Sequence, residues 1–118
     1  MLMSFNVIAS TISEIKTRLV VPCSSEVPAT RPSEFVTVER TGGQYELGKD
    51  NPTLAVQCWA STDTKAYSLA LAVAEVLRNM RETVPQVCRS TVSSVYRFDA
   101  PGDQQRRYQI VFDLVCRP

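Results

Sequence analysis

The stretch of residues 63–82 limits the folds open to this chain more than any other part of its sequence. Its apolar residues recur at intervals of three and four, which is the repeat of an α-helix that buries one face. Ser61 or Thr62 can cap its start, and Pro85 closes it. The residues predicted for the buried face are Ala66, Leu69, Ala70, Val73, Leu77 and Met80. A helix with one apolar stripe must pack on another element, so the rest of the chain has to supply a surface for it.

A second helix is predicted at the start of the chain, over residues 4–19, with Ser4 as its cap. Because many of its residues are β-branched, its intrinsic propensity is modest, and the helix depends on docking its apolar stripe. The stripe consists of Phe5, Ile8, Ile12, Ile15 and Leu19. Three prolines then keep residues 20–33 extended or turned, with room for a short edge strand near residues 20–24.

Four segments have the alternation or the β-branched content of strands: residues 35–40, 53–60, 91–98 and 108–116. Residues 42–52, between the first two, predict a long loop, because their Gly-Gly, Leu-Gly and Asn-Pro steps favour irregular backbone. The order of elements predicts an α+β fold in one domain, residues 1–118. Its single antiparallel or mixed sheet has about four to five strands, with two helices packed on one face.

Composition argues against several classes of function. The chain has 13 basic and 12 acidic residues, a net charge of +1, and no histidine. Without histidine, the Ser-His-Asp and Cys-His arrangements of nucleophilic catalysis cannot be built, and no glycine motif for a phosphate or dinucleotide occurs. We therefore predict no enzyme activity, no cofactor and no catalytic or metal site. The near-neutral charge predicts no tight nucleic-acid binding, and no apolar stretch is long enough for a membrane span.

The four cysteines are spaced too widely for a clustered metal site: Cys23, Cys58, Cys88 and Cys116. We expect reduced thiols in a protein made in the cytosol, with Cys58 and Cys116 at inward-facing strand positions. Two disulfides in a secreted protein are the alternative that an even count leaves open. Trp59 alternates with Cys58 and is expected to point off the core, where an exposed tryptophan marks a contact surface.

Several short motifs, in their order and spacing, give the chain a family resemblance: residues 31–36, 38–43, 51–60, 95–97 and 107–112. With these motifs the chain resembles the tail terminator, or tail completion, proteins of long-tailed bacteriophages. The resemblance covers nearly the whole chain. It implies a small structural subunit that forms a homo-oligomeric ring, expected to be a hexamer, at the end of the tail nearest the head.

The resemblance also implies what such a ring does. It caps the tail tube, ends the polymerisation of the tube protein and gives the head-tail connector proteins a surface to join. The virion would be assembled in the cytoplasm of a bacterial host, and the chain would catalyse no reaction. Candidate contacts are the helix of residues 4–19 and the segment of residues 42–52. The single residues singled out for the interface are Gly42, Gly43, Tyr45, Glu46, Leu47, Lys49, Asp50 and Trp59.

Two alternatives remain at this point. Another neck component, a head-completion or connector adaptor protein, would share the virion setting but have a different neighbour. A small-molecule-sensing domain of the ferredoxin-like type would have the order β-α-β-β-α-β. The predicted order, with a helix first and three strands before the second helix, counts against that domain.

Overall fold

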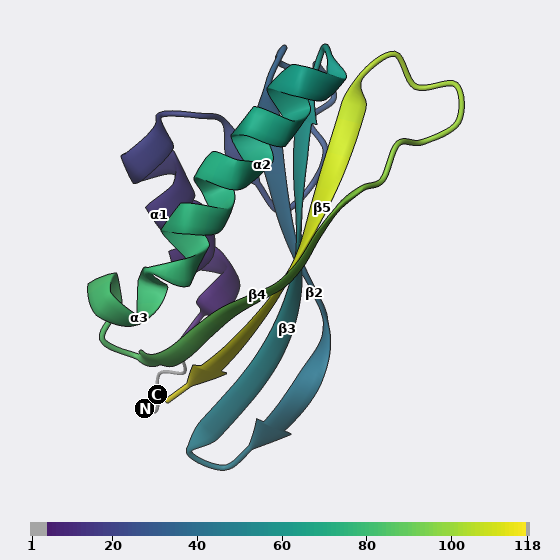
Figure 1. Cartoon of the computed structure of the whole chain (residues 1–118). Coiled ribbons are helices and arrows are strands. Elements are labelled where there is room, and N and C mark those ends of the chain that lie inside the picture. The colour runs from purple at the N-terminus through teal and green to yellow at the C-terminus, as the bar shows by residue number, and fades with distance from the viewer. Residues whose placement is uncertain (1–4, 118) are drawn as a thin grey trace.

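The computed structural model describes residues 5–117, which form one five-stranded mixed sheet with its helices on one face (Figure 1). The elements are α1 (Val7–Leu19), β1 (Cys23–Ser24), β2 (Phe35–Glu46), β3 (Lys49–Ala60), α2 (Asp63–Arg78), α3 (Met80–Thr83), β4 (Val87–Arg97) and β5 (Arg106–Cys116). In space the strands follow the order β1-β2-β3-β5-β4. Only β1 and β2 are parallel. The predicted α+β class is confirmed, and the element order differs from that of the ferredoxin-like alternative.

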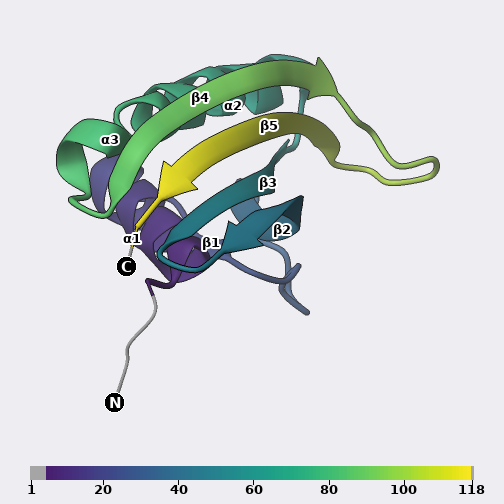
Figure 2. The ribbon, with the colours of Figure 1, turned by 90° about the horizontal axis from the view of Figure 1, so that it is seen from below.

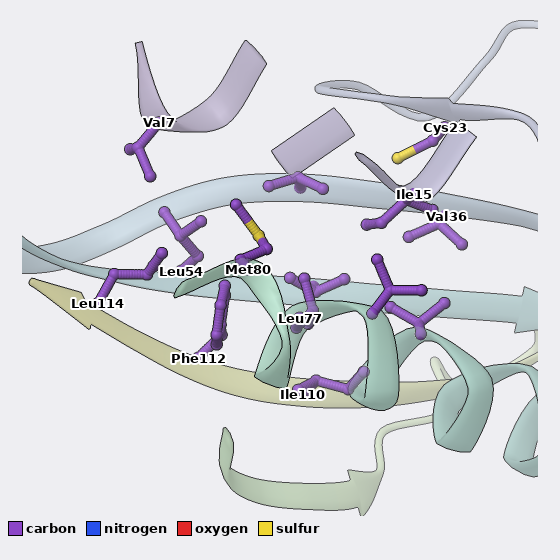
Figure 3. Packing of buried hydrophobic residues seen from close by; sticks show 14 of the residues in the cluster. Val7, Ile15, Cys23, Val36, Leu54, Leu77, Met80, Ile110, Phe112 and Leu114 are labelled. Carbon is purple, nitrogen blue, oxygen red and sulfur yellow. The ribbon is translucent and has the colours of Figure 1, made fainter. Parts of the chain in front are cut away.

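The hydrophobic core lies between the helices and the sheet (Figure 3). Alternate residues of β3 and β5 point into it and meet the inner face of α2. The fully buried side chains of these three elements include Leu54, Val56, Cys58, Val73, Leu77, Ile110 and Phe112. The predicted stripe of α2 is confirmed except at Leu69, which is only partly buried. Burying one such leucine contributes roughly 1.5–3 kcal/mol.

The predicted long helix of residues 63–82 is broken into two. Thr62 caps α2, α2 ends at Arg78, and α3 begins at Met80. The hydroxyl of Ser90 in β4 donates to the Arg78 carbonyl over 2.7 Å and accepts from the Arg81 N–H at 3.3 Å. A side chain distant in sequence thus satisfies backbone groups that the break leaves open. Met80, the first residue of α3, is fully buried in the core.

Helix α1 begins later than predicted. Asn6 is its cap, with its side-chain oxygen accepting from the Ala9 N–H at 3.0 Å, whereas Ser4 lies outside the described residues. The buried centre of its face is Val7, Thr11 and Ile15, and most of the predicted stripe is only partly buried at its margin. Thr11 is tolerated there because its hydroxyl donates to the Val7 carbonyl over 2.7 Å.

The predicted loop of residues 42–52 is wrong. Strands β2 and β3 pair through it, from Phe35 opposite Trp59 to Glu46 opposite Lys49, and only Leu47 and Gly48 form the turn. Glycine pairs and Asn-Pro steps interrupt most strands, and here each is accommodated by an irregularity. The register shifts between Arg40 and Gly42, while β5 leaves Asn51 and Pro52 unpaired. The short edge strand expected near residues 20–24 is confirmed as β1.

Candidate functional site

The end of the β2–β3 hairpin, residues 41–52, extends past the helices, and we call it the arm (Figure 1). All of residues 41–49 are exposed. Two apolar side chains stand out among them: Tyr45 is 70% exposed and Leu47, in the turn, is fully exposed. Such side chains gain free energy when a partner covers them, so the arm is the candidate assembly surface of the chain.

Glycine is required at two places in the arm. Gly48 has a φ of 76° at the second turn position, the conformation that a type II turn needs. Gly43 has a φ of 98°, and a Cβ there would lie only 2.1 Å from the Asn51 carbonyl oxygen. At Gly42, by contrast, nothing lies within 4 Å of an added Cβ. Gly43 therefore allows the two strands to approach closely after the register shift.

An ion pair braces the base of the arm. The guanidinium of Arg40 donates to both carboxylate oxygens of Asp50, over 2.7 and 2.9 Å. It also donates to the carbonyls of Gly42 and Gly43, at 3.0 and 3.2 Å. The bond to Asp50 raises the pKa of Arg40 above its ordinary value. These four bonds join Arg40 to both strands of the arm. Because the guanidinium is planar, they fix the orientation of the two strands relative to each other.

A small hollow lies where the arm meets the two ends of the described chain. Its lining comprises Phe5, Tyr45, Glu46, Gly48, Lys49, Asp50, Cys116 and Arg117. Burial raises the pKa of the Cys116 thiol to about 11, so at neutral pH the thiol is protonated and a poor nucleophile. Among residues 5–117 no group of three histidine, cysteine or acidic side chains could hold a metal ion.

Trp59 is not the exposed contact residue that the sequence predicted. Its side chain does leave the core, yet only 3% of it is exposed. Phe35 stacks on the indole with ring centroids 5.1 Å apart, and the guanidinium carbons of Arg31 and Arg107 lie 5.0 and 4.6 Å from its centre. The same Arg107 lies 4.7 Å from the ring of Phe98. Aromatic and cation–π stacking thus covers the tryptophan on the open face of the sheet.

Polar side chains elsewhere on that open face are hydrogen-bonded across strands. The Gln57 amide donates to Gln109 over 2.8 Å, and the Gln109 amide donates to the hydroxyl of Tyr96. Further along, the hydroxyls of Thr53 and Ser93 each donate to Asp113 over 2.7 Å. Sequence reasoning missed these pairs, because the spacing of residues along one strand does not show which strand lies beside it.

The structure brings seven of the eight candidate residues together and leaves one apart. Gly42, Gly43, Tyr45, Glu46, Leu47, Lys49 and Asp50 all belong to the arm. Trp59 lies at the opposite end of the same hairpin, paired with Phe35. Of the second candidate region, α1, the described part packs against α2, β2 and β1. A partner can reach only its outer side. No helix within residues 5–117 is both long and apolar enough to cross a bilayer.

Comparison with solved structures finds this fold in another protein. A chain from a structure described as the virion of a native gene transfer agent particle superposes with a TM-score of 0.71. The superposition covers 97% of this chain and 100% of that chain, at 11% sequence identity. At this identity the likeness shows a shared fold. No family model matches the chain, and no curated protein matches it.

Proposed function

We propose that this chain is a structural protein of a phage-like virion, and specifically a tail terminator. Its subunits form a ring, expected to be hexameric, on the end of the tail tube nearest the head. The observation that carries the proposal is the whole-length likeness in fold to a chain from a gene transfer agent virion. It agrees in kind with the tail-terminator resemblance of the sequence, which rests on separate motifs.

The arm gives the proposal a physical mechanism. The open end of a tube presents a head-to-tail interface that each added subunit renews, so growth continues until something covers that interface without renewing it. An exposed Leu47 and Tyr45 on a braced hairpin suit such a contact, because burying them gains free energy and the arm is already ordered. The remaining faces of the ring then meet the connector proteins of the head.

The experiment that tests the proposal removes the arm's contacts and keeps the fold. Replacing Tyr45 and Leu47 with serine should leave thermal unfolding nearly unchanged, because both side chains are exposed. Glu46 is kept, so that the variant changes only the apolar contacts of the arm. In a complementation assay with the phage or particle that encodes the protein, we expect overlong tails, which then fail to join heads. Electron microscopy of tail lengths measures the outcome.

The matched control is Val20→Ser, which removes an apolar side chain that is 89% exposed and lies outside the arm. It should give normal tails. Normal tails from the arm variant would remove the arm from the interface. Normal tails in the absence of the protein would overturn the terminator function. Tails of normal length that stay headless in the absence of the protein would favour a neck adaptor instead.

A further inference from the structure

The outer edge of β4 is open to pairing with another strand. It is the last strand of the sheet, and within residues 5–117 no other strand bonds to its far side. Seven consecutive residues, 90–96, contain no charge, proline or glycine and are rich in β-branched residues. Edge strands that must stay unpaired usually carry such interruptions, since an unprotected edge attracts another strand.

The backbone groups along this edge point outward. The Phe98 N–H donates to the Arg107 carbonyl of β5 over 2.8 Å, so this residue faces inward across the sheet. Alternate residues of a strand turn the same way, which directs the N–H groups of Val95 and Arg97 to the outside. Register shifts near Cys88 and Ser93 bend the strand locally.

A second open edge lies on the other side of the same sheet. Within residues 5–117, β1 pairs only with Val36 and Thr37 of β2, so the outer edge of β2 has no partner strand from Val38 to Glu46. The carbonyls of Gly42 and Gly43 already accept from Arg40. This edge contains its own register shift, after Arg40. Figure 2 shows β4, β5, β3 and β2 side by side, with β4 and β2 on opposite sides of the strand pair that they enclose.

The edges of β4 and β2 carry opposite charges and run in opposite directions. Arg89 of β4 is exposed, as are Glu39 and Glu46 of β2, and none of the three has an ion pair within the described chain. Each of the three strand junctions between β2 and β4 is antiparallel, so β2 and β4 run in opposite directions. A rotated copy of the chain therefore presents its β2 antiparallel to β4.

The register places the charges at matching levels. Gln44 pairs with Asn51, which has no partner of its own in β5. When the register between Asp50–Cys116 and Thr53–Asp113 is extended through Asn51, that residue is level with Val115, which pairs with Arg89. Subunits of a closed ring are not shifted along the ring axis relative to one another. If the strands run along that axis, residues at the same height in two neighbouring copies therefore lie beside each other. Arg89 then lies opposite Gln44 of the next copy and diagonal to Glu46, on the same face of the sheet. Diagonal neighbours are within reach of long side chains.

We infer that copies of this chain join edge to edge, with β4 of one copy adding antiparallel to the uncovered part of β2 in the next. The contact is heterologous, since each copy uses one edge on each side, and it closes into a ring when the rotation allows. This inference rests on the proposed ring and assigns its subunit interface. It leaves the arm's turn, with Leu47, free for a different partner.

Charge reversal tests this contact. Arg89→Glu and Glu46→Arg should each weaken assembly at least about tenfold, because each places like charges at every interface. A mixture of the two variants should assemble again, since alternating copies restore an opposite-charge pair at both kinds of junction. Sedimentation velocity at low salt follows the species. Lys65→Glu, an equal charge change at an exposed site of α2, is the control and should assemble as the wild type does.

Hydrogen exchange supplies the second measurement. The amides of Val95 and Arg97 should exchange slowly in assembled wild-type protein and rapidly in the Arg89→Glu variant, whose monomer is still folded. A wild-type protein that stays monomeric, an Arg89→Glu variant that assembles normally, or a mixture that fails to assemble would each overturn the inference. The tail-length assay is independent: a tail defect on deletion, together with normal assembly of Arg89→Glu, would reject this interface and keep the proposed function.

Discussion

The two halves of the β2–β3 hairpin are held by different means. In the half near Phe35 and Trp59, one face packs under the helices and the other is covered by the stacked rings and guanidinium groups. In the arm, residues 41–49 are all exposed, and the strands depend on their ladder, two glycine conformations and the pair between Arg40 and Asp50. The same two strands therefore pass from a buried sheet to a solvated ribbon.

The two halves of the hairpin differ in what stabilises them. The covered half gains its stability from burial, which tolerates no large change of volume. The arm gains little from burial and is defined by conformational constraint, which leaves its outward side chains free for a partner. An isolated two-stranded ribbon is only marginally stable, so the brace and the continuous strands from the body are what keep the arm ordered.

The largest expected effect separates core from surface. Leu77→Ala should lower the free energy of unfolding by about 2–5 kcal/mol, because Leu77 is fully buried and leaves a cavity. Leu71→Ala, on the same helix at a site 46% exposed, should change it by less than about 0.5 kcal/mol. Chemical denaturation measures both. Similar losses for the two variants would contradict the assigned core face of α2.

A smaller effect tests whether conformation, more than burial, defines the arm. Gly43→Ala should cost about 1–3 kcal/mol, because the new Cβ meets the Asn51 carbonyl in a left-handed backbone conformation. Gly42→Ala, with open space around it, is the matched control and should be nearly neutral. Thermal unfolding gives the magnitude, and amide chemical shifts in the arm show where it acts. Equal effects at the two positions would show that the close approach does not matter.

The smallest effect concerns the ion pair at the end away from the arm, where Arg31 and Asp103 tie the β4–β5 turn to the segment before β2. The bond from Arg31 lowers the pKa of Asp103 below its ordinary value of 3.8. A carboxyl whose pKa is lower in the folded state stabilises the protein above that ordinary value, and the contribution is lost as the pH falls through the folded value.

Arg31→Met should therefore raise the pKa of Asp103 toward its ordinary value, and the variant's stability should depend less on pH in the acid range. An NMR titration of the side-chain carboxyl measures the shift. Arg18→Met removes a comparable exposed partner elsewhere, from Glu14, and should leave Asp103 unchanged. An unmoved Asp103 titration in Arg31→Met would show that the pair contributes nothing to the turn.

Local periodicity was enough to predict most of the body. The spacing of apolar residues in α2 and their alternation in β5 each identify one face, because a helix and a strand have fixed repeats. From those faces the layer arrangement follows, since an apolar stripe and an apolar sheet face must cover one another. The segment of the arm was predicted as a loop, from its Gly-Gly, Leu-Gly and Asn-Pro steps, and the pairing of its two strands was missed.

What the tertiary structure decided depends on partners that are distant in sequence. Ser90 bonds the backbone groups at the break between α2 and α3, and Asp50 orients Arg40. Arg31 and Arg107 cover a tryptophan that alternation alone had placed in solvent. The strands of the arm continue through Gly43 and Pro52, which lie opposite each other. Gly43 has no side chain to collide with the backbone of β3, and Pro52 has no partner in β5 that would need its missing N–H. Sequence determines the repeats along one strand or helix, whereas the alignment of strands determines which side chains meet.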